Sequence, residues 1–296
     1  MATGPTTTPT DRPPARAGDA PRLADDTCPH CHGRGWRVER DGGAGRAVPC
    51  VCRRRRRLEL NLERSRIPAH YRRCRLSNFM VSGGPEASAR LTRAKSLAQR
   101  YVKTFYDAEA REFRRSGLLF IGPPGTGKTH LAVAVLQELI ERYALRGRFV
   151  DFTRLLYEIQ STFGADVQQT RADLLEPVIR AEVLVLDELG AQKPTEWAMD
   201  NLYLIINSRY TEGRTTLFTT NYQLEREKVR ATRVRGTASG RIESDEPERG
   251  PKRETLLASR LSASLVSRLY EMAQPVVLAA ADYRREVKQT QHRLGG

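Results

Sequence analysis

One stretch of the sequence has the residue types and spacing of a phosphate-binding loop. Residues 122–129 read Gly-Pro-Pro-Gly-Thr-Gly-Lys-Thr and fit the pattern G-x-x-x-x-G-K-[ST] in full. An apolar run precedes the loop and a helical segment follows it, which is the context that the pattern requires. The glycines let successive backbone N–H groups point at phosphate oxygens, and the helix adds the positive end of its dipole. The predicted nucleotide-binding residues are Gly122, Pro123, Pro124, Gly125, Thr126, Gly127, Lys128, Thr129 and His130.

Further residues along the chain could complete a magnesium-dependent hydrolysis site. We expect Lys128 to contact the β- and γ-phosphates and the Thr129 hydroxyl to ligate Mg²⁺. An apolar run ends in Asp187 and Glu188. Asp187 is predicted to hold the Mg²⁺ and its water shell, and Glu188 to orient or deprotonate the attacking water. The alternative is a strand-end pair of acidic residues with only a capping role.

Asn221 follows the next apolar run. It is predicted to sense the γ-phosphate and the attacking water. In isolation, an asparagine at the end of a strand is usually a turn residue.

Four cysteines near the N-terminus have the spacing of a metal site. They form the pairs Cys28-Pro-His-Cys31 and Cys50-Val-Cys52, which enclose a glycine-rich stretch. Four thiolates around one Zn²⁺ would make a closed structural site. His30 or His32 could replace one cysteine, and free thiols or an iron–sulfur cluster are the other interpretations. A fifth cysteine, Cys74, has no partner nearby in the sequence and is read as a plain thiol.

The basic charge of the chain is concentrated beside these cysteines. Fourteen arginines and four acidic residues lie between Cys28 and Arg75, so this segment holds +10 of the formal net charge of +15. The run Arg53–Arg57 lies at its centre and predicts a nucleic-acid-binding patch, with a merely solvated face as the alternative. The sequence has no apolar stretch near the roughly 20 residues of a membrane helix and no signal peptide, so we expect a cytoplasmic protein.

The positions of apolar runs predict how these residues are held. Short apolar runs alternate with helical segments from Leu118 to Thr220, which is typical of a parallel α/β sheet. The predicted organisation is a disordered tail (1–27), a zinc module with its arginine run (28–57), a helical linker (58–110), an ATPase domain (111–285) and a tail (286–296). Polar residues at about 229–255 predict an insertion within the ATPase domain.

Taken together, the motifs resemble one family of ATPases. The sequence is similar to AAA+ P-loop NTPases of the bacterial helicase-loader group (DnaC/DnaI) and of the IstB transposition ATPases, over about residues 117–285. The stretches that carry this resemblance are 117–131, 183–190 with Trp197, 206–210, 219–222, 267–269 and 282–284.

The resemblance implies a parallel five-stranded sheet flanked by helices, ATP hydrolysis and homo-oligomers in the ATP-bound state. It also implies that Arg268 is an arginine finger that reaches the ATP of a neighbouring subunit, and that Arg284 is a second sensor. This sequence departs from the pattern in its long connection between Asn221 and Arg268, and little follows Arg284 where the group has a helical lid.

The expected function is that of a replicative helicase loader that binds DNA, with single-stranded DNA favoured, and that has no membrane partner. One alternative is a transposition accessory ATPase that recruits a transposase. The other is a zinc-containing nucleic-acid adaptor whose ATP site only regulates assembly.

Overall fold

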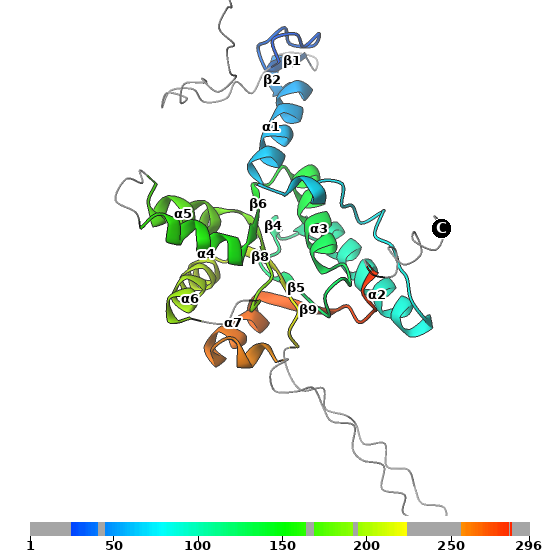
Figure 1. Ribbon diagram of the computed structural model, residues 1–296. Helices are drawn as coiled ribbons and strands as arrows, with labels where there is room; N and C mark the ends of the chain where they lie inside the picture. The colour runs from blue at the N-terminus through cyan, green and yellow to red at the C-terminus, as the bar shows by residue number, and fades with distance from the viewer. Residues whose placement is uncertain are drawn as a thin grey trace, which may run out of the picture. The chain divides into compact units, whose positions relative to one another are not determined.

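The computed structural model describes residues 25–40, 45–163, 169–191, 195–223, 256–283 and 285 (Figure 1). The chain divides into two compact units, Met1–Glu59 and Leu60–Gly296. The predicted insertion at 229–255, the tail at 286–296, most of the tail at 1–27 and the predicted sensor Arg284 lie outside the described residues. Among the described residues, no helix is both long and apolar enough to cross a membrane.

The second unit contains the predicted parallel sheet. Five strands lie in the order β6-β7-β8-β5-β9, and every neighbouring pair is parallel. The strand before the phosphate-binding loop, β5, is therefore separated by β8 from β7, the strand that ends in Asp187. The strands are β5 (Gly117–Ile121), β6 (Gly147–Asp151), β7 (Val183–Asp187), β8 (Thr215–Thr220) and β9 (Ala273–Val277).

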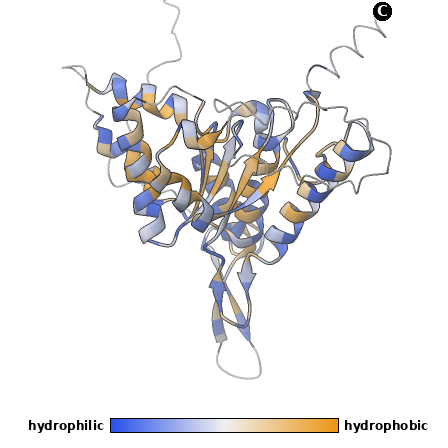
Figure 2. Ribbon diagram, turned by 90° about the horizontal axis from the view of Figure 1, so that it is seen from below, coloured by the Kyte–Doolittle hydropathy of each residue, from blue (hydrophilic) through white to orange (hydrophobic). Residues whose placement is uncertain are grey.

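Helices cover both faces of the sheet and create two apolar cores. Along β5, Leu118 and Phe120 face one core, and Leu119 and Ile121 face the other, as the alternation of side chains along a strand requires. Figure 2 shows the strands and the inward sides of the helices in hydrophobic colours. The continuous apolar character of β5 and β7 follows from burial on both faces.

The helices divide between these two cores. On one face lie α2 (Pro85–Lys103) and α3 (Lys128–Tyr143). On the other face lie α4 (Phe152–Ser161), α5 (Arg171–Arg180), α6 (Glu196–Thr211), the short helix η3 (Leu257–Ser259) and α7 (Ala263–Met272).

The region between the cysteines and the sheet is more varied than a plain helical linker. The spacing of apolar residues predicts one helix over Ala87–Asp107, but α2 ends at Lys103. The chain then turns Phe105 into a group of aromatic rings with Phe113 and Tyr143. Phe113 belongs to a short antiparallel hairpin of two strands, β3 (Tyr106–Asp107) and β4 (Glu112–Phe113). Earlier in the chain, this region also contains the short helix η1 (Ala69–Tyr71).

The first unit is small and contains the cysteines. Two antiparallel strands, β1 (Trp36–Arg40) and β2 (Gly45–Pro49), lie between the two cysteine pairs. The helix α1 (Val51–Arg64) begins within the second pair and continues beyond this unit. The four cysteines of the first unit form a separate buried cluster.

Candidate nucleotide and metal sites

The phosphate-binding loop joins β5 to α3 at the carboxyl end of the sheet, where ligands bind in open α/β sheets. Gly125 and Gly127 have φ of 80° and 91°, a conformation that side chains disfavour. A Cβ atom at Gly125 would lie 1.8 Å from Asp282 Oδ1, and one at Gly127 would lie 2.6 Å from Phe79 Cε2. The loop is therefore packed on both sides, and its backbone conformation requires glycine at these positions.

The lysine of the loop folds back onto the loop itself. Lys128 Nζ donates a hydrogen bond to the Pro123 carbonyl at 2.8 Å, and the Thr126 hydroxyl donates to the same oxygen at 2.9 Å. Lys128 is buried. This contact holds a cation at the loop, next to the backbone N–H groups that can receive phosphate.

The structure brings the two predicted magnesium ligands together. The Thr129 hydroxyl donates to Asp187 Oδ1 at 3.0 Å, although 58 residues separate the two in sequence. Asp187 is buried at the end of β7, and burial raises the pKa of its carboxyl group to about 6. A hydroxyl and a carboxylate in direct contact beside a phosphate-binding loop suit a Mg²⁺ ion that also binds phosphate oxygens.

A second hydroxyl, which the sequence motifs do not single out, fixes this carboxylate. Thr219 Oγ1 donates to Asp187 Oδ1 at 2.5 Å and accepts a hydrogen bond from the Glu188 backbone N–H at 3.0 Å. Thr219 is buried on β8, the strand that lies between β5 and β7. The strand order explains the contact, and the order is not visible in the sequence.

Glu188 and Asn221 lie at the same edge of the sheet. Glu188 follows β7, is exposed, and has a φ of 58°, so its backbone is in the left-handed region. Non-glycine residues in this conformation are uncommon and occur often at functional sites. Asn221 follows β8 directly and is also exposed. Both predicted roles stay predictions, but both residues follow strands whose carboxyl ends lie beside the loop.

A cavity of about 180 Å³ opens beside the phosphate-binding loop. The loop residues Gly125 and Gly127 line it, and so does His130. The walls also include Phe79 and Met80 from the segment before α2, and Tyr283 from the end of the chain, whose hydroxyl lies 3.0 Å from Met80 Sδ. Phe79 and Met80 come from a segment without a pattern of its own, so motif reasoning misses them. Tyr283 lies in the stretch 282–284 that carries the family resemblance, but the resemblance gave a role to Arg284 alone.

His130, which was predicted to bind nucleotide, also lines this cavity. Its Nε2 lies 3.0 Å from the Arg75 carbonyl oxygen, and its ring meets Phe79 edge-on at 5.4 Å between centroids. Burial lowers the pKa of its imidazole. The histidine therefore ties α3 to the segment that covers the cavity.

The predicted arginine finger, Arg268, is not among the residues that line this cavity. Arg268 is on α7, half-buried against α6, and its guanidinium donates a hydrogen bond to Asn207 Oδ1. Two tyrosine rings of α6 flank the same guanidinium.

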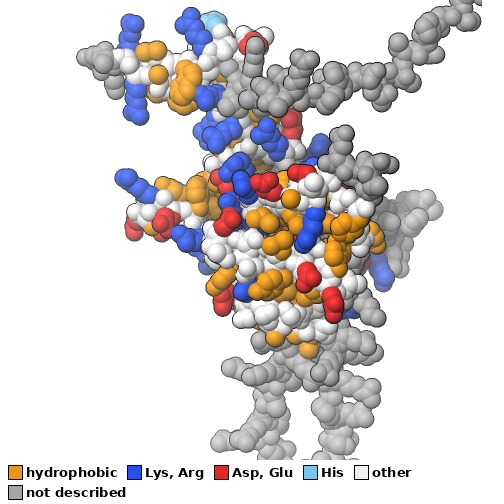
Figure 3. All heavy atoms as spheres, turned by 90° about the vertical axis from the view of Figure 1, so that its left-hand side faces the viewer, with side chains coloured by type: hydrophobic (Ala, Val, Ile, Leu, Met, Phe, Trp, Pro, Cys, Tyr) orange, Lys and Arg blue, Asp and Glu red, His pale blue; other side chains and the backbone are white. Residues whose placement is uncertain are grey.

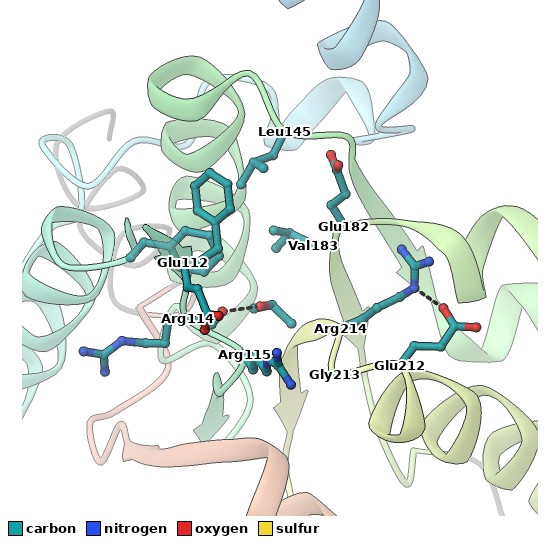
Figure 4. Close-up of a pocket in the computed structure, with 12 residues that line it drawn as sticks. Glu112, Arg114, Arg115, Leu145, Glu182, Val183, Glu212, Gly213 and Arg214 are labelled. Carbon is teal, nitrogen blue, oxygen red and sulfur yellow. Dashed lines mark hydrogen bonds and ion pairs between the residues drawn. The ribbon is translucent and has the colours of Figure 1, made fainter. Parts of the chain in front are cut away.

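A larger cavity, of about 440 Å³, is at the opposite edge of the sheet (Figure 4). Most of its residues precede β5, β7 and β8, and Val183 and Thr215 are the first residues of β7 and β8, so the cavity lies at the amino ends of the strands. Arg214 donates to the Glu212 carboxylate, and the Thr215 hydroxyl donates to the Arg114 carbonyl at 2.7 Å. Ligands of parallel sheets bind at the carboxyl ends of the strands. The smaller cavity is therefore the candidate nucleotide site.

The four cysteines of the first unit form a cluster of metal-ligand geometry. Their sulfur atoms all lie within 4.8 Å of one another. The distance from Cys28 Sγ to Cys50 Sγ is 3.7 Å, and that from Cys31 Sγ to Cys52 Sγ is 3.4 Å. A tetrahedron with Zn–S bonds of about 2.3 Å has sulfurs about 3.8 Å apart. The donor set therefore fits zinc.

Backbone N–H groups and neighbouring thiols act differently on the sulfurs of the cluster. The Gly35 N–H donates to Cys31 Sγ at 3.3 Å. The backbone N–H of His30 lowers the pKa of Cys28 to about 7, whereas burial and the neighbouring thiols raise the pKa of Cys52. His30 and His32 are exposed, whereas all four cysteines are buried. Four sulfurs therefore describe the cluster better than three sulfurs and a histidine.

The arginine run lies on the first turns of α1, beside the cluster. Arg53 stacks over the Trp36 ring at 4.4 Å, Arg55 pairs with Asp25 at 2.9 Å, and Arg56 pairs with Glu59 at 3.3 Å. Figure 3 shows basic side chains around this part of the chain. Arg54 and Arg57 are exposed to solvent.

Comparison with known proteins places the chain in a family. The model of the family described as IstB-like ATP binding protein matches residues 51–230. The phage-like element PBSX protein XkdC of Bacillus subtilis is 24% identical over 71% of this chain and 80% of its own length. The replicative helicase loader DnaC of Escherichia coli is 29% identical over 57% of this chain, and the match spans 64% of the loader.

Solved structures agree with this result. A crystal structure of the DnaC helicase loader has a TM-score of 0.52 and 30% identity, and the match covers 71% of this chain and 99% of the other. A crystal structure of DnaI has a TM-score of 0.51 at 22% identity, which supports the fold alone. With a family match over more than half of its residues, and with a phosphate-binding loop on a five-stranded parallel sheet, the chain belongs to the family of IstB-like ATP binding proteins.

Proposed function

We propose that this protein is a magnesium-dependent ATPase that loads a replicative helicase onto DNA. The observation that carries the ATPase proposal is the contact between Thr129 and Asp187 across the sheet edge. In the proposed site, Lys128 binds the β- and γ-phosphates, Thr129 and Asp187 hold Mg²⁺, and the cavity walled by Phe79 and Tyr283 receives the base.

Hydrolysis needs a water that is placed in line with the γ-phosphate rather than covalent help from the protein. In the proposal, Glu188 accepts a proton from that water, and Asn221 binds the water and the γ-phosphate. Arg268 of a neighbouring subunit stabilises the charge that develops, and Arg284 senses the phosphate. These roles place the complete site between two copies of the chain, so we propose that ATP binding assembles a homo-oligomer.

The first unit is proposed to hold one structural Zn²⁺ on Cys28, Cys31, Cys50 and Cys52. When bound, the ion would contribute folding free energy to a module whose described apolar core consists of these cysteines. The arginines beside it are proposed to contact DNA phosphates, with Trp36 as a stacking surface. The relatives named as helicase loaders favour a helicase as the protein partner.

The family model supports a second candidate function, because its description is that of the IstB-like proteins. In that case the chain would bind duplex DNA and recruit a transposase. Co-purification of the full chain with a replicative helicase and, separately, with a transposase from the same genome tests the choice. A loader would form an ATP-dependent complex with the helicase and increase the unwinding of a forked DNA substrate. An ATP-dependent complex with the transposase alone would show the second function instead.

A further inference from the structure

Three residues of α6 form a stripe that meets Arg268. Tyr203, Asn207 and Tyr210 are spaced by four and three residues, so their side chains lie on one side of the helix. The helices α6 and α7 pack against each other beside the sheet (Figure 1). The stripe therefore lies under the α7 residue that is proposed to act on the neighbouring ATP.

The guanidinium of Arg268 is held on this stripe from three directions. Its centre lies 5.2 Å from the Tyr203 ring and 5.4 Å from the Tyr210 ring, and it donates a hydrogen bond to Asn207 Oδ1. Both distances are within the range of cation–π attraction. A guanidinium has five N–H donors in a rigid fork, so the bond to Asn207 does not exhaust its capacity for phosphate oxygens.

The second helix also fixes one of the two rings. The Tyr210 hydroxyl interacts with the Glu271 carboxylate of α7, which raises the pKa of the tyrosine. Tyr203 and Tyr210 remain 42% and 44% exposed, and Arg268 beside them is only half-buried. The rings thus present the arginine at the surface and do not bury it.

We propose that Tyr203, Asn207 and Tyr210 form a clamp that positions Arg268 for the ATP site of a neighbouring subunit. The inference rests on the proposed function, because Arg268 must act between subunits. A free arginine side chain samples many rotamers, and ordering it opposes binding. The clamp orders the side chain before the subunits meet, so the arginine loses less entropy in the transition state.

Steady-state ATP hydrolysis by the assembled protein tests the clamp. In the double variant Tyr203→Leu/Tyr210→Leu we expect kcat to fall by about 3- to 30-fold, the factor to which one or two cation–π contacts correspond. The KM for ATP and the affinity for a non-hydrolysable ATP analogue should stay unchanged, because each subunit's own site is intact. Tyr203→Phe keeps its ring and leaves the Tyr210 hydroxyl in place, so it should retain the wild-type kcat. Tyr157→Leu is the matched control, since Tyr157 is an exposed tyrosine of α4.

A mixing experiment separates a positioning effect from damage to the fold. A Glu188→Gln subunit has an intact clamp and a defective site of its own, whereas the leucine variant has the opposite combination. The mixture should therefore hydrolyse ATP faster than the mean of the two separate preparations. If the leucine variant binds ATP poorly, Asn207→Ala is used in the same assays and decides the question.

The outcomes distinguish the clamp from the function on which it rests. If Arg268→Ala keeps the wild-type kcat, the proposed finger role is wrong and the clamp has no purpose. If Arg268→Ala lowers kcat but the leucine variant does not, or if the leucine variant is faster than wild type, the clamp is wrong and the finger role stands. Absence of complementation in the mixture also contradicts the clamp.

Discussion

At the scale of single residues, the candidate site depends on how one carboxylate is held. Asp187 lies between two threonine hydroxyls, one from the loop helix α3 and one from β8. The hydroxyl of Thr219 also accepts the N–H of Glu188, so it sets the position of the next residue as well. Groups that hydrogen-bond to a metal ligand and orient it commonly affect metal affinity and activity almost as much as the ligand itself.

Replacing Thr219 by valine tests this arrangement. The change keeps the shape of the side chain but removes the donor to Asp187 and the acceptor for Glu188. We expect an activity loss of about 10- to 100-fold with a higher Mg²⁺ requirement, measured as ATP turnover against Mg²⁺ concentration. Thr216→Val is the control, because Thr216 is buried on the same strand but bonds Arg209. An equal Mg²⁺ requirement in the two variants would show that Thr219 has no special role.

The residues with a motif were predictable from the sequence, and their supports were not. The loop and the pair Asp187 and Glu188 follow local patterns that a reader can recognise. Thr219 became part of the site because β8 lies between two strands that precede it in the chain. Phe79 and Tyr283 became walls of one cavity although about 200 residues separate them. Contacts of this kind depend on topology, and single-sequence patterns carry little information about it.

At the scale of secondary-structure elements, a buried arginine joins three parts of the sheet and its helices. Arg209 of α6 is fully buried and donates to the carbonyls of Val178, Ile179 and Ala181 at the end of α5. It also donates to the Thr215 carbonyl at the start of β8. The guanidinium thus satisfies carbonyls at a helix end that would otherwise be buried without partners.

We expect Arg209→Met to destabilise the second unit by about 3 kcal/mol or more, because several buried carbonyls lose a charged donor. Arg209→Lys should recover little of this, since an ammonium cannot reproduce the planar fork. Urea unfolding measures the change. Arg180→Met is the control, because Arg180 is an exposed arginine paired with Glu176, where we expect less than about 1 kcal/mol. Similar unfolding midpoints for the two methionine variants would contradict the role of Arg209.

Zinc binding by the cysteine module can also be tested directly. Cys50→Ser should abolish the proposed zinc binding and the ordered structure of the module, while the proposed ATP binding by the second unit should stay at the wild-type level. Cys74→Ser is the matched control, because Cys74 is buried but lies outside the cluster. Zinc content per chain is the measurement. Equal zinc in Cys50→Ser and wild type would contradict the proposed site.

Strands and helices were largely predictable because short apolar runs, clearest in β5 and β7, alternate with helical segments along the chain. The residues at which helices and strands begin and end were less predictable. The helix predicted to reach Asp107 ends at Lys103, since aromatic packing of Phe105 outweighs the helical spacing. Arg209 lies in a stretch that carries the family resemblance, but only the fold shows that its side chain is buried.

At the scale of the whole molecule, the excess positive charge and the candidate nucleotide site are found in different parts of the chain. The segment from Cys28 to Arg75 holds most of the excess positive charge. The phosphate-binding loop and Asp187 come later in the chain, between residues 122 and 187. We propose that the first part holds DNA and the second part drives a cycle of binding and release.

Salt dependence tests the proposed DNA contact. The affinity for single-stranded DNA should fall steeply as salt rises, with a slope of about 0.7 in log–log form for each phosphate contacted. Arg54→Gln/Arg57→Gln should weaken binding and reduce that slope. Arg90→Gln/Arg93→Gln removes the same charge from α2 and is the control. A slope near zero, or equal slopes in the two variants, would contradict a phosphate-binding role for the arginine run.

The most direct test of ATP-driven action is the behaviour of Glu188→Gln. The amide keeps the size of the side chain but cannot take a proton from water, so turnover should fall by about 10²- to 10⁴-fold. The affinity for ATP and Mg²⁺ should stay at the wild-type value, because Lys128, Thr129 and Asp187 are untouched. Glu182→Gln, a change at a surface glutamate that pairs with Arg146, should leave both quantities unchanged. Wild-type turnover in Glu188→Gln would contradict the proposed mechanism at its catalytic step.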